Sequence, residues 1–144
     1  MVLSKSCIYG IRAALLIALK EQNEGKRYVP IRELAEELSL SFHFLTKILQ
    51  GLTEEKMLHS YRGPNGGVGL AKPAGQIRII DIVTAIDGGE LFAECLLGFP
   101  GCGEETPCPM HESWAHHRDG LKKTFEQATL AGLARDVTAQ NLRK

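Results

Sequence analysis

Three of the four cysteines in the chain lie close together in the sequence, at Cys95, Cys102 and Cys108, and His111 follows the last of them after two residues. Thiolates are the standard ligands of iron–sulfur clusters, and three thiolates with one further ligand complete four positions. Zinc sites usually use pairs of ligands two to four residues apart, and here only Cys108 and His111 are that close. The spacing favours an iron–sulfur cluster, with zinc and redox-active thiols as the alternatives.

The composition fits a cytoplasmic globular protein. Of 144 residues, 44% are hydrophobic and 24% are charged, which supplies enough apolar material for a core. The apolar run near the N-terminus is broken by Arg12 and lacks a small-residue cleavage site, so it predicts an amphipathic helix and not a signal peptide. No run reaches the roughly 18 apolar residues that a membrane span needs. In the cytoplasm, clustered cysteines bind metals or act as redox thiols more often than they form structural disulfides.

The first half of the chain has the pattern of a winged helix-turn-helix. Apolar residues recur at helical spacing over 5–20, 31–38 and 45–52, with a polar loop at 21–30 and a short serine-containing turn near Leu40. Strand-like residues follow on both sides of "GPNGG" (63–67), which is dense in turn formers. A hairpin directly behind a helix-turn-helix is a wing, and this arrangement predicts DNA binding.

The second half predicts a helix at 76–87, stopped by Gly88 and Gly89, and a last helix at 111–131. An apolar seam along the last helix favours a partner helix and therefore a homodimer. Its members are Trp114, His117, Leu121, Phe125 and Ala128. We expect a mainly α fold with a winged helix-turn-helix domain at 1–75, a linking helix at 76–92, a cysteine-rich cluster-binding loop at 93–111, and a long dimerisation helix with a C-terminal tail at 112–144.

The exposed face of the second helix of the pair is expected to enter the major groove. Lys47 can reach guanine or a phosphate, and Gln50 can pair with adenine. Phe44 either contacts a thymine methyl group or packs between helices. The formal net charge is zero, so useful affinity calls for two copies on a two-fold site in double-stranded DNA. The predicted contacts are Ser41, His43, Phe44, Thr46, Lys47 and Gln50 in the helix and Arg62, Pro64, Asn65 and Gly66 in the wing.

The order of these motifs resembles the Rrf-two family of winged-helix regulators, which includes IscR-, NsrR- and CymR-like branches. The resemblance rests on "YGIRAALLIAL", "IRELAEELSLSFHFLTKILQGL", "RGPNGG", "IRIIDIVTAIDG", the three cysteines, "HESW" and "ATLAGLA". It implies a homodimer on near-palindromic operators, and a [2Fe-2S] or [4Fe-4S] cluster on Cys95, Cys102 and Cys108. It also implies that loss or oxidation of the cluster changes operator affinity.

The chain departs from the family pattern at three places. The first cysteine spacing has six intervening residues where five are usual, and Val68 and Gly69 replace the aromatic and basic residues common after the double glycine. The resemblance assigns the fourth ligand to His111, with Cys7 as the alternative, because the position used in the NsrR branch is Ile8, which cannot ligate. We expect a regulator that senses redox state, nitric oxide or iron status. The alternative is a cluster-free regulator acting through a partner protein or thiol oxidation. No nucleophile–base pair or phosphate loop indicates an enzyme.

Overall fold

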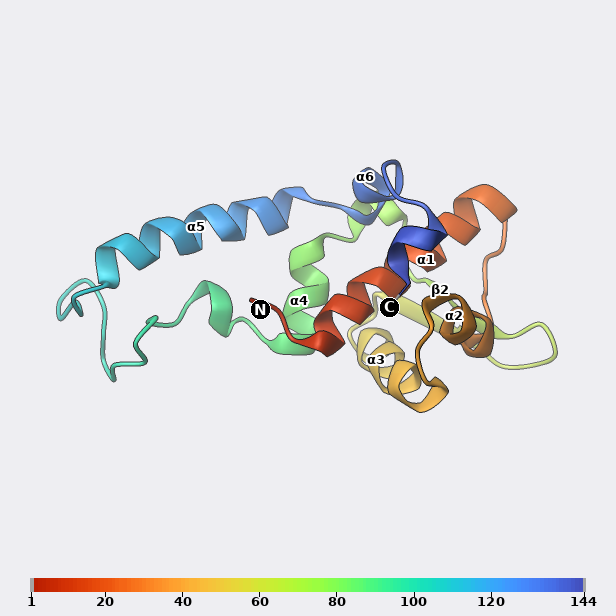
Figure 1. The fold of residues 1–144 in the computed structure, drawn as a ribbon, viewed down its shortest axis with the longest axis horizontal. Coiled ribbons are helices and arrows are strands. Elements are labelled where there is room, and N and C mark those ends of the chain that lie inside the picture. Colours follow the sequence, from red (N-terminus) through yellow and green to blue (C-terminus); the bar gives the residue numbers. More distant parts are fainter. Residues whose placement is uncertain (1, 144) are drawn as a thin grey trace.

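The computed structural model describes residues 2–143, and its first helix, α1 (Lys5–Glu24), runs through the centre of the larger, compact part of the molecule, the head (Figure 1). Ser4 caps this helix by accepting a hydrogen bond from the Cys7 backbone N–H. Gly25 ends it with a left-handed φ of 65°, a conformation that glycine adopts without strain. The helix therefore includes residues 21–24, which were predicted to be loop.

The next two helices form the predicted helix-turn-helix. They are α2 (Ile31–Leu38) and α3 (Phe42–Glu54), which pack against each other and against α1. Ser39 takes a left-handed φ of 59° in the turn, and the Ser41 hydroxyl caps α3 by accepting from the Phe44 N–H at 3.1 Å. Leucines at the predicted spacing fill the space between these helices. The fully buried ones are Leu34, Leu38, Leu45, Leu49 and Leu52.

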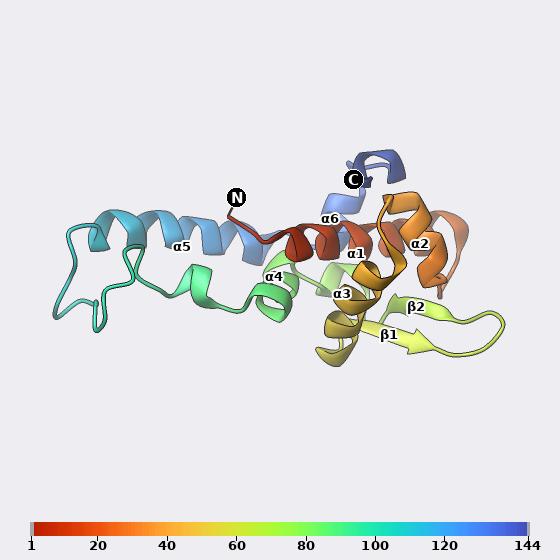
Figure 2. The ribbon, with the colours of Figure 1, turned by 60° about the horizontal axis from the view of Figure 1, so that its bottom comes forward.

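The wing is an antiparallel pair of strands, β1 (Leu58–Tyr61) and β2 (Gly67–Leu70), as predicted (Figure 2). Val68 also bridges to Val29, so the segment before α2 lies against the far side of β2. Gly67 and Gly69 make this approach possible. A Cβ atom at Gly67 would lie 2.2 Å from the Val29 carbonyl oxygen, and one at Gly69 would lie 2.0 Å from that of Arg27. Backbone packing thus explains why no larger residue occupies these wing positions.

The helix α4 (Ile79–Asp87) follows a short 3-10 turn, η1 (Ala74–Gln76), and packs against α1 and α3. It starts later than the predicted residue 76, because Arg78 and Asp81 form a capping pair at its N-terminus. Ile82 and Val83 are fully buried in the core of the head. Gly88 then turns the chain with a φ of 84° toward a second 3-10 turn, η2 (Glu90–Phe92).

The helix α5 (His111–Gln127) is shorter than the predicted helix at 111–131. The break occurs because Ala128 is extended, and its carbonyl oxygen accepts from the Ile79 N–H at 2.9 Å. The chain then forms α6 (Leu130–Ala134) and a 3-10 turn, η3 (Ala139–Leu142), which return to α1.

The predicted seam on α5 is therefore interrupted. Phe125 packs edge-to-face on Phe92 at 5.6 Å between ring centroids, and Leu121 also contacts the core. His117 is exposed, and Ala128 lies beyond the helix. Part of the apolar surface assigned to a partner helix is thus covered within the chain.

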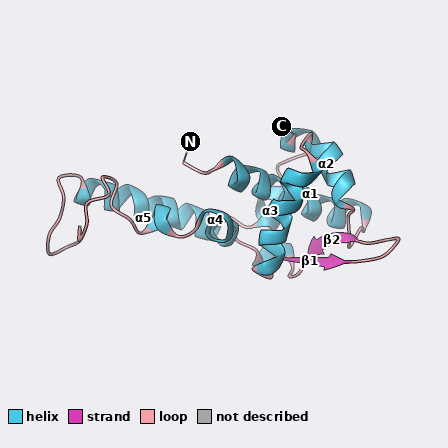
Figure 3. Cartoon of the chain, turned by 90° about the horizontal axis from the view of Figure 1, so that it is seen from below, coloured by secondary structure: helices cyan, strands magenta, loops and turns pink. Residues whose placement is uncertain are grey.

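Two parts of the molecule stand out in the views from the side and from below (Figures 1 and 3). The head contains α1 to α4, the wing, α6 and η3, whereas α5 projects away from it. The cysteine loop (residues 93–110) lies at the far end of that projection, beside the start of α5. Within residues 2–143, no helix is long and apolar enough to cross a membrane.

Candidate functional site

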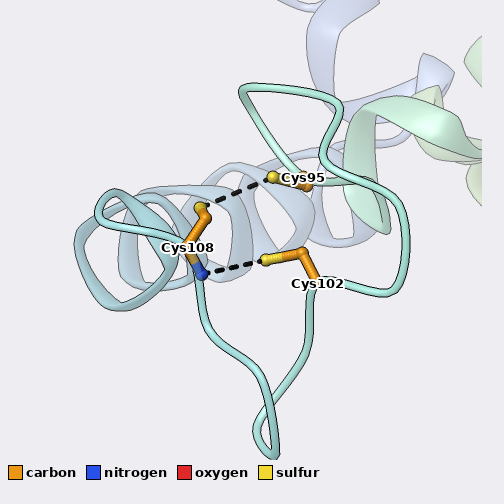
Figure 4. Close-up of side chains that lie close together, drawn as sticks. All are labelled: Cys95, Cys102 and Cys108. Carbon is orange, nitrogen blue, oxygen red and sulfur yellow. Dashed lines mark hydrogen bonds between the residues drawn. The ribbon is translucent and has the colours of Figure 1, made fainter.

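The cysteine loop brings Cys95, Cys102 and Cys108 together at its base (Figure 4). Their three Sγ atoms all lie within 4.8 Å of one another, and those of Cys95 and Cys108 are 3.5 Å apart. The Cys108 backbone N–H donates to the Cys102 Sγ at 3.4 Å. All three side chains are half-buried. The predicted trio therefore converges on one point, although 13 residues separate its first and last members.

Backbone turns produce this convergence. Gly98 has a φ of 67° and donates to the Cys95 carbonyl oxygen, and Gly101 has a φ of 73° just before Cys102. These left-handed conformations favour glycine, which accounts for its density in the loop. The Thr106 hydroxyl donates to the Gly101 carbonyl oxygen at 2.7 Å and closes the tip.

His111 is the first residue of α5, and its Nδ1 lies 3.5 Å from the Cys102 Sγ. It therefore stands beside the thiol group as a fourth donor from the same chain. Cys7, by contrast, is fully buried in the head. Burial, with the charge and hydrogen bond of Asp87, raises the pKa of the Cys7 thiol to about 12. A thiol held in this form is a poor metal ligand, which favours His111 over Cys7.

The loop makes its thiols chemically unequal. A hydrogen bond from the Phe99 backbone lowers the pKa of Cys95 to about 7 against the effect of burial. Burial raises the pKa of Cys108 above its ordinary value. Since the thiolate is the form that binds metal, Cys95 is better prepared than Cys108 to act as a ligand. Three thiols and an imidazole at these separations form a donor set that fits an iron–sulfur cluster.

The predicted DNA-contacting residues of α3 separate into two groups. His43, Lys47 and Gln50 are exposed on its outer face. Ser41 caps the helix, whereas the Thr46 hydroxyl donates to the Phe42 carbonyl oxygen at 2.7 Å. Phe44 is half-buried against the Tyr9 ring, with centroids 6.0 Å apart. The first group is free to read a groove, and the second shapes the helix that carries it.

In the wing, the predicted residues Arg62, Pro64 and Asn65 are exposed at the tip, and Gly66 is half-buried. A Cβ atom at Gly66 would lie 2.3 Å from the Tyr61 carbonyl oxygen, so this glycine is required by the turn itself. The sequence interpretation missed Tyr28, which stacks on Tyr61 with ring centroids 5.1 Å apart. The signal available was the basic and aromatic "KRY" that precedes Val29.

The contacts of three further residues were also missed. Asp87 accepts hydrogen bonds from Ser4 at the start of α1. Trp114, which the sequence places on the apolar seam, also donates its indole N–H to the Glu94 carbonyl oxygen, and Arg118 donates to the same oxygen. The spacing of Trp114 and Arg118, four residues apart on one helix, was the signal that could have paired them.

Known proteins of similar sequence and fold point to one family. The Rrf2 family, described as an iron-dependent transcriptional regulator, matches residues 3–136. The chain is 30% identical over 125 residues to the HTH-type transcriptional regulator IscR of Cronobacter sakazakii, covering 87% of this chain and 75% of that protein.

Solved structures agree with this assignment. CymR, the global cysteine regulator of B. subtilis, superposes with a TM-score of 0.80 at 25% identity, covering 94% of this chain and 98% of that one. T. potens IscR shares the fold, with a TM-score of 0.71 at 22% identity over 99% of this chain and 92% of that one. The winged helix-turn-helix with its C-terminal helix, predicted from the sequence, is confirmed. The chain belongs to the Rrf2 family and is a DNA-binding transcriptional regulator, not an enzyme.

Proposed function

We propose that this regulator senses redox state, nitric oxide or iron status through an iron–sulfur cluster on Cys95, Cys102 and Cys108, with His111 as fourth ligand. The observation that carries the proposal is the convergence of three Sγ atoms within 4.8 Å, with the His111 Nδ1 3.5 Å from one of them. When bound, the cluster supplies a redox- and ligand-sensitive centre. The chain's own residues would hold it in the loop between η2 and α5, at the far end of α5 (Figure 1).

The position of the cysteine loop supports a regulatory role. The loop follows α4, which packs against α1 and the recognition helix α3, and it leads into α5, which contacts α4 again. A change in loop conformation therefore reaches α3 through α4. We propose the functional division accordingly: a winged helix-turn-helix domain over 1–75, a linking segment with α4 over 76–92, a cluster-binding loop over 93–111, and α5 with the C-terminal tail over 112–144.

Operator binding is proposed to involve a homodimer on near-palindromic double-stranded DNA. The outer face of α3 presents His43, Lys47 and Gln50, and the wing tip presents Arg62 and Asn65. The chain carries no net charge, so two heads on one operator supply the phosphate contacts that one head lacks. The projecting α5 is the element proposed to join the two copies.

The cluster is tested by anaerobic purification and reconstitution, followed by the absorption spectrum and by iron, sulfide and zinc analysis. We expect a coloured protein that contains iron and sulfide, and a Cys102→Ala variant that is colourless. A His111→Ala variant is expected to alter the spectrum, whereas Cys7→Ser leaves it unchanged. A wild-type protein that takes up no iron, or that binds zinc alone, would refute the cluster.

A second candidate is a cluster-free regulator controlled by thiol oxidation. The observation in its favour is the 3.5 Å separation of the Cys95 and Cys108 Sγ atoms, which a modest movement converts into a disulfide. Iron-free protein treated with oxidised glutathione then yields a Cys95–Cys108 linked peptide and altered operator binding. Normal regulation by a variant with serine at 95, 102 and 108 excludes both thiol oxidation and the cluster, and leaves partner-protein control.

A further inference from the structure

Two side chains of α5 hold the backbone that leads into the cysteine loop. The Trp114 indole N–H donates to the Glu94 carbonyl oxygen at 3.0 Å. One helical turn later, Nη1 of Arg118 donates to the carbonyl oxygens of Ala93 and Glu94, both at 3.1 Å. Residues four apart lie on the same face of a helix, so both donors meet one short segment.

This segment is the last one before Cys95. The amides of Ala93 and Glu94 donate to the Glu90 carbonyl oxygen at 3.1 and 2.9 Å, as the end of the η2 turn. Their carbonyl oxygens are the groups that Trp114 and Arg118 bind. His111 begins the same helix. The hydrogen bonds of Trp114 and Arg118 therefore fix the position of Cys95 relative to that of His111.

Arg118 also lines a cavity of about 290 Å³ beside the cysteines. The other side chains that matter there are Cys95, Cys102 and His111, with the carboxylates of Glu104 and Asp119. Arg118 is the guanidinium cation of this cavity, which it lines together with two carboxylates and two of the three thiols. Among residues 2–143, its Nε is the buried side-chain donor with no hydrogen-bond acceptor. A buried donor without an acceptor in a native site calls for an explanation, and a further bound group is one.

We propose that Trp114 and Arg118 form a clamp that fixes the backbone before Cys95 and so the position of that thiol, and that Arg118 also supplies positive charge beside the anionic cluster. Both are positioning residues. Their hydrogen bonds hold the backbone before Cys95, and the Arg118 charge acts across the cavity on the group bound by the cysteines. The second part rests on the proposed cluster function. The first part does not, since all three hydrogen bonds join atoms of the protein chain.

The clamp is tested first on full-length, cluster-free protein. Trp114 is the single tryptophan in the chain, so its emission reports on its own hydrogen bond. Arg118→Gln and Trp114→Phe are expected to accelerate amide hydrogen exchange at Ala93 and Glu94 by about 10-fold, and Arg118→Gln also shifts the Trp114 emission. Lys122→Gln, an exposed cation on the same helix, is the matched control and behaves as wild type. Far-UV circular dichroism verifies that each variant is folded.

The charge is tested on reconstituted protein by the rate of cluster loss to an iron chelator and by the reduction potential. Loss from Arg118→Gln is expected to be about 10–100-fold faster than from wild type, as for other residues that support metal ligands. The potential falls, because an anionic cluster loses a neighbouring cation. Arg118→Lys keeps the charge without the planar guanidinium group, so its loss rate and potential are expected to lie between those of wild type and Arg118→Gln. Lys122→Gln is expected to match wild type in both.

The outcomes separate the two parts of the proposal. Wild-type hydrogen exchange at Ala93 and Glu94 in both Arg118→Gln and Trp114→Phe overturns the clamp. Accelerated exchange with an unchanged loss rate and potential in Arg118→Gln overturns the charge role and leaves the clamp. Wild-type protein that binds no iron overturns the cluster function and the charge role with it, and the hydrogen-exchange result still decides the clamp.

Discussion

Asp87, the last residue of α4, accepts hydrogen bonds from both the backbone N–H and the hydroxyl of Ser4, the N-cap of α1. The hydrogen bond from the Ser4 backbone nitrogen to the Asp87 Oδ2 is 2.9 Å long. A carboxylate at this position also interacts favourably with the positive end of the α1 dipole. These hydrogen bonds join α4 to α1. The end of α4 leads toward the cysteine loop, and Tyr9 of α1 contacts Phe44 of α3.

Asp87→Asn is expected to lower the free energy of unfolding by about 1 kcal/mol, since it removes a charged capping interaction. It is also expected to reduce the difference in operator affinity between cluster-loaded and cluster-free protein. Chemical denaturation and operator titration measure the two effects. Asp136→Asn, an exposed carboxylate in the C-terminal segment, is the control and should remain within about 0.5 kcal/mol of wild type. If Asp87→Asn is destabilised but its operator affinity changes on cluster loss as much as that of wild type, the residue serves only to cap α1.

Lys20 is a nearly buried cation within the head. Its Nζ lies 2.5 Å from Glu37 and 2.9 Å from Glu33, and only 6% of the residue is exposed. Lys20→Met is expected to destabilise the fold by about 1–3 kcal/mol, because charged hydrogen bonds are lost and the carboxylates are left partly buried. Thermal unfolding at pH 7 measures the change.

The same contacts predict how this difference depends on pH. Burial opposes the charged form of Lys20, but the hydrogen bonds of Glu37 and Glu33 outweigh it and raise the lysine pKa above 10.5. Hydrogen bonds from Lys20 and Lys26 lower the pKa of Glu33 below 4.5. A depressed carboxyl pKa stabilises the fold above the unfolded value, and this stability is lost as the pH falls through the folded value. The difference in the free energy of unfolding between wild type and Lys20→Met should therefore be constant near neutral pH and become smaller below about pH 4.5. A gap that widens in acid would contradict this assignment.

Glycines of the wing and of α5 should respond in opposite directions to alanine. Gly69→Ala places a Cβ atom 2.0 Å from the Arg27 carbonyl oxygen, so the backbone must shift, at a cost of about 1–3 kcal/mol. Gly120 lies within α5 and has open space around its Cβ position. Gly120→Ala is therefore expected to stabilise that helix by about 0.5–1 kcal/mol. Denaturant titration of both variants gives the sign of the change in the free energy of unfolding. A Gly69→Ala variant with wild-type stability would show that the wing does not need this close approach.

Operator binding should separate the exposed side chains of α3 from those that build the helix. Lys47→Ala is expected to weaken binding and to reduce the slope of log affinity against log salt by about 1, as for loss of one phosphate contact. Gln50→Ala should cost about 1–3 kcal/mol at one base position. Lys123→Ala, which removes an exposed cation from α5, should leave binding unchanged. An unchanged affinity in Lys47→Ala would place the DNA on another face.

Sequence periodicity was sufficient for most of the head. The leucines of α2 and α3 recur at helical spacing, and "GPNGG" marks the hairpin, so local patterns identify both elements. Helix ends were less predictable. The polar residues 21–24 carry no apolar signal, and the end of α5 is set by the pairing of Ala128 with Ile79, a contact between distant residues.

The proposed ligand residues could be found from the sequence because cysteines are rare in the chain and clustered there. Their supporting contacts could not. Arg118 binds carbonyl oxygens 24 and 25 residues earlier, and Ser4 meets Asp87 across 83 residues. Backbone acceptors carry no side-chain signature, so only the folded chain reveals which donors reach them.

The most direct test of the central claim is the affinity for operator DNA of the same preparation, measured with its cluster and after the cluster has been removed anaerobically. The account predicts that the affinity of wild type changes by about 5–150-fold, the usual range of coupling between two sites. It predicts no change for Cys102→Ser, which cannot hold the cluster. Equal affinities for the cluster-loaded and cluster-free wild-type protein would contradict the account.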